Sequence, residues 1–135
     1  MPLVGGGGAP NVAGSNPTGT GSSINYIGNH AYAYSGPISS NGSSTADTVA
    51  LQFSTGNSYI VGYISFQTTE LGGGTCFVDL KINDQVIMDV QWDNDPTKAP
   101  DYLDVILPPY SDVTVLTGTA NDKTMTAQIT GRVYA

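Results

Sequence analysis

Residues 75–93 read TCFVDLKINDQVIMDVQWD, and this stretch decides the fold. Apolar side chains alternate with other residues up to Asn83-Asp84, and the alternation resumes from Val86 to Trp92. A period of two is typical of a half-buried strand, because successive side chains leave opposite faces. Asn and Asp tolerate the left-handed backbone of a tight turn, so we predict a two-residue hairpin turn at Asn83-Asp84. The expected inward rows are Cys76, Val78, Leu80 and Ile82, followed by Val86, Met88, Val90 and Trp92.

The rest of the chain must supply strands that cover this hairpin, since an isolated hairpin is marginally stable in water. Six further segments alternate in the same way, and turn-forming residues separate them. They are residues 30–34, 48–55, 58–69, 102–107, 112–119 and 124–134. We therefore predict an all-β fold in which eight antiparallel strands form a sandwich of two four-stranded sheets.

The position of the hairpin favours a single jelly-roll. If jelly-roll strands are lettered B to I, only E and F are neighbours both in sequence and in a sheet. The two-residue turn lies between the fourth and fifth predicted strands, which would be E and F. An up-and-down barrel is the alternative topology.

Two strands carry specific expectations about their faces. In the segment 48–55 we expect Val49, Leu51 and Phe53 to face the core, with Ala50 on the opposite face. In the segment 58–69, Gly62 falls in the inward row, which indicates a bend or a bulge at that position.

Residues 1–25 differ in composition from residues 26–135, which we expect to form the jelly-roll domain. This N-terminal segment is rich in Gly, Pro, Ser, Asn and Thr and has no charged side chain. Such a composition buries too little apolar surface to offset the entropy of ordering, so in isolation a flexible arm is expected. It is either a disordered tail or an arm that orders on a neighbouring subunit, with Leu3 and Val4 in its apolar anchor.

Composition argues against several classes of function. The chain has 11 acidic residues, 4 Lys and Arg, and a net charge of -7, so it lacks the basic stripe that nucleic acid or an anionic membrane surface requires. The N-terminus lacks the basic and apolar regions of a signal peptide. Cys76 is the single cysteine and falls on an apolar face, where we expect it to act as a small hydrophobe.

No catalytic or cofactor motif emerges, and we expect neither an enzyme nor a metal site. His30 is the single histidine and has no Cys, Glu or second His near it in sequence. The acidic loop 93–101 lacks the Gly and closing Glu of an EF-hand. The remaining carboxyls that we considered are Asp79, Asp89 and Asp104, which fall on outward positions where solvent is expected to leave their pKa near its ordinary value.

Large apolar side chains also fall on the outward faces. They are Tyr59, Tyr63, Phe77 and Ile87, to which we add Tyr110 in the turn after Pro108-Pro109. They are either ordinary exposed apolar surface or part of an interface, where aromatic residues are enriched. We favour the interface, formed with neighbouring copies and together with Leu3 and Val4 of the arm.

Three stretches resemble small viral jelly-roll proteins, namely the decoration (cement) and minor capsid proteins of tailed phages and related marine viruses. They are ADTVALQFSTGNSYIVGYISF (46–66), LPPYSDVTVLTG (107–118) and ITGRVYA (129–135), and the resemblance covers residues 27–135. It implies a structural virion protein on the capsid surface, a homotrimer that contacts the major capsid protein. Terminal arms of such proteins often run over neighbouring subunits.

A second hypothesis from a different class is a carbohydrate-binding module or a receptor-binding tip on the same architecture, because a fold does not determine a function. This hypothesis requires an exposed aromatic platform, for which we expect Trp92, Tyr102 or Tyr110 at the loop edges.

Overall fold

The computed structural model describes residues 24–39, 46–68, 74–93, 102–119 and 124–134. Within these ranges the chain is all-β and contains no helix. Its ten strands are β1 (Asn25–Ile27), β2 (His30–Tyr34), β3 (Ile38–Ser39), β4 (Thr48–Ser54), β5 (Tyr59–Thr68), β6 (Thr75–Ile82), β7 (Gln85–Asp93), β8 (Leu103–Leu107), β9 (Asp112–Thr119) and β10 (Thr124–Tyr134).

The predicted number of eight strands was too low. The eight predicted segments correspond to β2 and to β4 through β10, and the two additional strands are the short β1 and β3. β1 forms a hairpin with β2, and it begins at Asn25, which we had assigned to the N-terminal arm. Residues 1–23 of the predicted arm, including Leu3 and Val4, lie outside the described residues.

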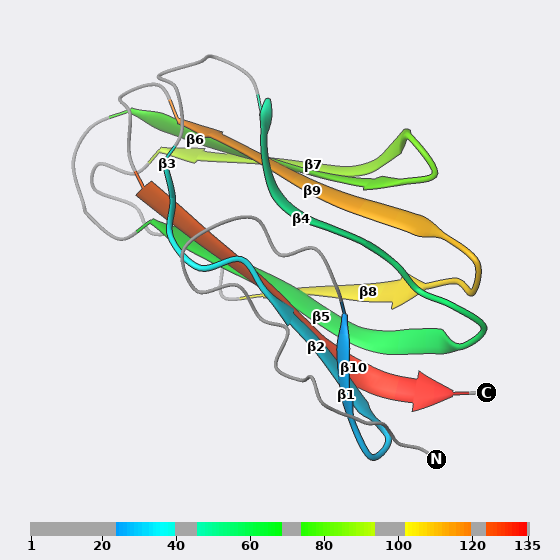
Figure 1. Cartoon of the computed structure of the whole chain (residues 1–135). Coiled ribbons are helices and arrows are strands. Elements are labelled where there is room, and N and C mark those ends of the chain that lie inside the picture. The colour runs from blue at the N-terminus through cyan, green and yellow to red at the C-terminus, as the bar shows by residue number, and fades with distance from the viewer. Residues whose placement is uncertain (1–23, 40–45, 69–73, 94–101, 120–123, 135) are drawn as a thin grey trace.

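The strands form two antiparallel sheets (Figure 1). One sheet has the order β1-β2-β10-β5-β8, with β3 also pairing with β10, and the other has the order β4-β9-β6-β7. Most strands that are hydrogen-bonded neighbours in a sheet are distant in sequence, as in the pairing of β10 with β2 and β5. The alternative of an up-and-down barrel is therefore wrong.

The predicted hairpin is confirmed as β6 and β7. Asn83 and Asp84 form its turn with φ values of 52° and 65°, the left-handed conformation that a primed two-residue turn requires. The register shifts between Leu80 and Lys81, and beyond this irregularity Val86 is exposed. Our expectation that Val86 faces the core was wrong, because alternation along β7 does not account for the shift in pairing.

A serine side chain joins β2 to β3 along the edge of β10. The backbone N–H of Ser35 donates to the carbonyl of Ala127 (3.0 Å), and the Ala127 N–H donates to Ser35 Oγ (2.9 Å). The hydroxyl thus takes the place of a backbone carbonyl, and Ser35 is fully buried. β2 and β3 consequently follow β10 as two pieces separated by Ser35, Gly36 and Pro37.

Both sheets contribute to one hydrophobic core. Its largest fully buried side chains include Ile60, Ile64 and Ile129 from one sheet and Leu51 and Leu80 from the other. Cys76 is buried in this core, as predicted.

The outward position that we expected for Ala50 was wrong. Ala50 is buried beside Leu51, because an irregularity in the pairing of β4 with β9 lies between Val49 and Leu51. Strict alternation assigned Ala50 to the outer face and missed this bulge.

The glycine expected at a bend lies where two strands approach closely. Gly62 of β5 is the register partner of Gly131 of β10. A Cβ atom added to Gly62 would overlap the carbonyl oxygen of Thr130, so this position has no room for any larger residue.

Candidate interaction surfaces

Three turns meet at one end of the molecule, which we call the turn end: residues 55–58, 83–84 and 108–111 (Figure 1, right). Thr55 joins two of these turns through hydrogen bonds. Its Oγ1 donates to the carbonyl of Pro108 (2.7 Å) and accepts from the N–H of Ser111 (3.1 Å), and its own N–H donates to the Ser111 carbonyl (3.0 Å). Thr55 and Ser111 are both buried, so these bonds are shielded from water. The turns therefore form one hydrogen-bonded unit.

The third turn is tied to the same unit through Asp112. The Asn83 N–H donates to the Asp112 carbonyl (2.8 Å), and the Asp112 N–H donates to Asn83 Oδ1 (2.9 Å). The Asp112 carboxylate accepts from Ser54 Oγ (2.7 Å). These bonds connect the β6–β7 turn to β4 and β9, so all three turns are held in fixed positions.

Large exposed side chains border the turn end. Tyr110 is 79% exposed and has a φ of 55°, a conformation that is uncommon for a residue with a side chain. Its N–H donates to the carbonyl of Gly56 (2.5 Å), which holds the residue in place. The other exposed apolar residues of this end are Tyr26, Tyr59, Val86, Ile87 and Tyr134. The most exposed aromatic ring thus stands on a rigid turn.

A second surface is the outward face of β2, β10, β5 and β8, which we call the tyrosine face. Its central residues are Tyr32, Tyr34, Tyr63, Thr130 and Arg132, with Tyr102 at the entry to β8. The rings form two pairs, Tyr32 with Tyr34 and Tyr63 with Tyr102, each with centroids 5.2 Å apart. Thr130 is the register partner of both Tyr32 and Tyr63, so it separates the two pairs.

The tyrosine face is hollowed. An open cavity of about 830 Å³ lies over β2, β10 and β5, and its lining includes Tyr32, Tyr63, Thr130 and Arg132. Thr130 Oγ1 is buried and has no hydrogen-bond partner. A buried hydroxyl without a partner is costly, so Thr130, a lining residue of the cavity, has an unused polar group.

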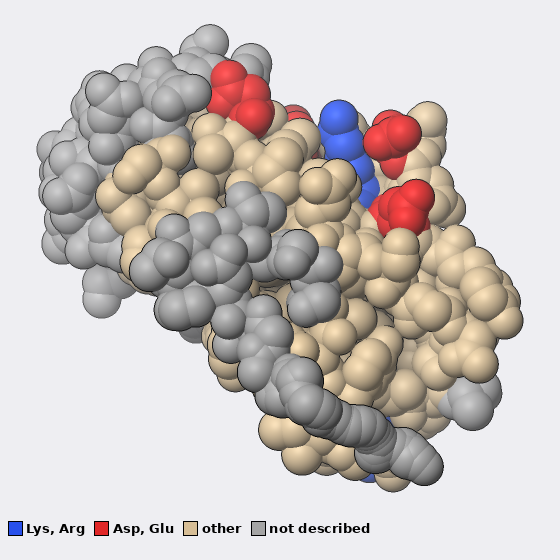
Figure 2. Space-filling view, in the orientation of Figure 1, with Lys and Arg blue, Asp and Glu red and all other residues tan. Residues whose placement is uncertain are grey.

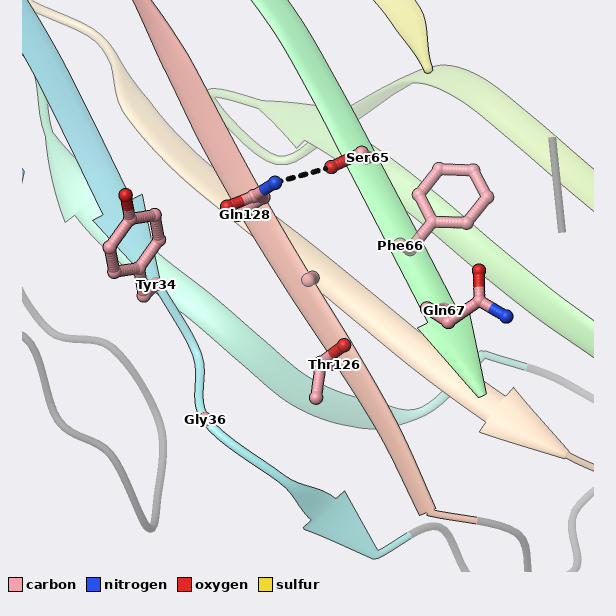
Figure 3. A pocket seen from close by; sticks show the side chains of 8 residues that line it. Tyr34, Gly36, Ser65, Phe66, Gln67, Thr126 and Gln128 are labelled. Carbon is pink, nitrogen blue, oxygen red and sulfur yellow. Dashed lines mark hydrogen bonds between the residues drawn. The ribbon is translucent and has the colours of Figure 1, made fainter. Parts of the chain in front are cut away.

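A smaller cavity of about 340 Å³ continues the tyrosine face past Tyr34 (Figure 3). Its lining is more polar and includes Ser65, Gln67, Thr126 and Gln128. Gln128 Nε2 donates to Ser65 Oγ (2.9 Å), which fixes the amide across the two strands. Tyr34 lines both cavities, so they are neighbours on the same face.

Charge is divided between the two sheets. In the view of Figure 2 the acidic side chains gather over the four-stranded sheet. Among the described residues Asp104 on β8 is the single acid in a strand of the other sheet, and the outward positions of β2, β10 and β5 include none. Arg132 and His30 lie there as register partners, and the Arg132 guanidinium lies 5.8 Å from the ring centre of Tyr134.

The outward face of the four-stranded sheet contains a carboxyl pair. Asp79 and Asp89 are register partners on β6 and β7. Partial burial raises the pKa of Asp79, and so do the charge of Asp89 and a side-chain hydrogen bond with it, while Lys81 opposes the shift. Our expectation of an ordinary pKa was wrong for Asp79, because its carboxyl is partly buried and, in addition, Asp89 lies across from it.

The expected interface residues do not form one patch. Tyr59, Ile87 and Tyr110 lie at or beside the turn end, Tyr63 lies on the tyrosine face, and Phe77 is partly exposed on β6. Sequence reasoning did not select Tyr32, Tyr34 and Arg132 for any surface. Alternation with Ala31 and Ala33 indicates that Tyr32 and Tyr34 share one face of a strand, but not that this face is the outward one.

The expectation that Trp92 lies exposed at a loop edge, as a platform for sugar rings, was wrong. Trp92 is buried on β7, and its ring stacks on Phe66 of the other sheet with centroids 5.3 Å apart. Tyr102 and Tyr110 are exposed, as that hypothesis requires. Residues 94–101 of the predicted acidic loop lie outside the described residues, as do residues 40–45.

Within the described part of the chain, no group of three or more His, Cys, Asp and Glu side chains is placed to hold a metal ion. No helix in that part is long and apolar enough to cross a membrane. Comparison with protein-family models and with curated proteins gives no match.

Proposed function

We propose that the chain is a single jelly-roll that acts as a structural virion protein, a capsid decoration or cement protein on the capsid surface. The order of the eight long strands supports this fold. Lettered B to I along the chain, β2-β10-β5-β8 reads B-I-D-G and β4-β9-β6-β7 reads C-H-E-F. These are the two sheet orders of a jelly-roll, with two additions: β1, which pairs with strand B, and β3, which pairs with strand I.

The turn end is the observation that carries the functional proposal. Its three turns are hydrogen-bonded to one another, so docking would order few additional backbone groups and the entropic cost would be small. Tyr110 and Ile87 project from this rigid base as exposed apolar anchors. Aromatic anchors surrounded by polar residues are typical of protein interfaces. We propose that the turn end contacts neighbouring copies and the major capsid protein.

The proposed assembly is a homotrimer without enzymatic activity. Closed cyclic assemblies are common among homo-oligomers, and in such an assembly each copy presents the same turn end to its neighbours. Leu3 and Val4 would add a second contact if the N-terminal arm runs over an adjacent subunit. The resemblance to small viral jelly-roll proteins supports both the trimer and the arm.

Occupancy on capsids that lack the protein tests this proposal. The wild type, an I87D/Y110A variant and a variant without residues 1–23 are each incubated with such capsids, and bound protein is quantified after sedimentation. We expect the first variant to lose binding and the truncated one to bind more weakly. Tyr102→Ala is the control, since Tyr102 is also an exposed tyrosine but lies on the tyrosine face. Full occupancy by the I87D/Y110A variant would contradict the proposed role of the turn end.

A further inference from the structure

We propose that the tyrosine face binds an acidic oligosaccharide, with sugar rings on the tyrosine rings and a carboxylate at Arg132. This binding activity is separate from the proposed capsid role and does not depend on it. Two open cavities that share Tyr34 lie next to each other on this face, which suits a chain of sugar rings better than a small enclosed ligand.

The rings supply the apolar part of this recognition. One face of a sugar ring presents C–H groups, which pack on the flat face of an aromatic side chain. The pairs Tyr32–Tyr34 and Tyr63–Tyr102 lie on either side of β10, so successive sugar rings could rest on each pair in turn. Tyrosine also carries a hydroxyl that can bond to a sugar hydroxyl.

Polar groups lie between and beside the rings. Thr130 lines the cavity between the two ring pairs, and its buried Oγ1 lacks a partner. Gln128 and Ser65 are hydrogen-bonded to each other in the lining of the smaller cavity, and they retain further donor and acceptor capacity. Aromatic surface combined with hydroxyl and amide groups matches a polyhydroxylated ligand.

The charged side chains near the cavity indicate that the ligand is acidic. The chain has a net charge of -7, yet the outward positions of β2, β10 and β5, which line the larger cavity, include no acidic residue and do include Arg132. Within the described strands, the single acid on the tyrosine face is Asp104 of β8, the register partner of Tyr63. Arg132 can bind a carboxylate through two parallel hydrogen bonds. One arginine is too little for a phosphate backbone, which requires a basic stripe. A uronic acid oligomer has both the required rings and the required charge.

Titration calorimetry with the full-length protein tests the proposal. The probes are an oligogalacturonate and a neutral malto-oligosaccharide of the same length, at physiological ionic strength. We expect the oligogalacturonate to bind more tightly. Arg132→Gln should weaken its binding about tenfold, the value of a charge-assisted hydrogen bond, and Tyr63→Ala should weaken both interactions. Tyr59→Ala is the control, because Tyr59 is an exposed tyrosine of the same strand outside the cavity lining.

Three results would overturn the proposal. The first is no binding of the oligogalacturonate, and the second is equal binding of both probes. The third is a Tyr63→Ala variant that loses self-association, since the tyrosine face would then be a contact between copies. A monomeric wild type that still binds oligogalacturonate would contradict the proposed trimer and leave the glycan site intact.

Discussion

Thr55 and Ser111 hydrogen-bond to each other twice, although they are 56 positions apart and belong to different turns. Thr55 Oγ1 also reaches Pro108, so one buried hydroxyl serves both as a donor and as an acceptor. Through this hydroxyl the turn that links β4 to β5 is fixed to the turn that links β8 to β9. The rigidity of the turn end, and the position of Tyr110 on it, therefore depend on Thr55.

Thr55→Val should destabilise the fold by about 2 kcal/mol, because it leaves the buried N–H of Ser111 and the partly buried carbonyl of Pro108 without partners. Urea unfolding followed by circular dichroism measures the change. Ser54→Ala is the control: its hydroxyl makes an exposed bond to Asp112, and we expect a change of less than about 0.5 kcal/mol. Equal stability of Thr55→Val and the wild type would show that the hydroxyl does not hold the turns together.

Gly62→Ala should cost about 3 kcal/mol or more, since the new methyl group would overlap the Thr130 carbonyl and force β5 away from β10. Gly131→Ala should cost less, because its nearest contacts are at 2.9 Å and one of them is a movable side-chain atom of Ile60. Thermal unfolding of the two variants checks the order. A larger loss for Gly131→Ala would contradict the close approach at Gly62.

Asp79→Asn should stabilise the protein at neutral pH by about 0.5 kcal/mol, the size of a cross-strand charge pair. Because folding raises the pKa of Asp79, the folded state binds more protons than the unfolded state between the two pKa values. The contribution of this carboxyl to stability is therefore fully present below its unfolded pKa, near 4, and is lost as pH rises through the folded pKa.

Urea unfolding of the Asp79→Asn variant and the wild type between acidic and neutral pH measures this difference. The advantage of the variant should shrink as the pH falls. Asp104→Asn, which removes an acid that lies across from Tyr63, controls for the change in net charge. A stability advantage that is independent of pH would mean that the Asp79–Asp89 pair is not its cause.

Tyr110→Gly should stabilise the fold slightly and weaken self-association. Glycine adopts a φ of 55° without steric cost, and the gain of about 1 kcal/mol is partly offset by the greater freedom of glycine in the unfolded chain. Tyr110→Ala removes the same ring but keeps the unfavourable backbone conformation, so it should weaken association without the gain in stability. Unfolding curves and sedimentation velocity of the two variants separate these effects. Wild-type association in both variants would exclude Tyr110 from the interface.

Periodicity along the chain was sufficient to predict the eight long strands and the Asn83-Asp84 turn. It missed β1 and β3, which are three and two residues long, too short to show a period. It also failed at Ala50 and Val86, where the pairing shifts. Alternation describes one strand by itself, whereas the face of a residue depends on its register with a neighbour.

The candidate surfaces depend on contacts between distant parts of the chain, which periodicity does not predict. Tyr32 and Tyr63 belong to one surface because β10 lies between β2 and β5. Asp79 and Asp89 face each other because of the register of the hairpin. Sequence reasoning could place each of these residues on a face of its strand, but only the sheet order brings them together.

The measurement that tests the central claim most directly is the solution mass of the full-length protein, by light scattering coupled to size exclusion. The proposed assembly predicts three times the 14.0 kDa of one chain for the wild type, and a single chain for the I87D/Y110A variant. A wild type that remains a monomer at every concentration, or a variant that keeps the trimeric mass, would contradict an assembly built on the turn end.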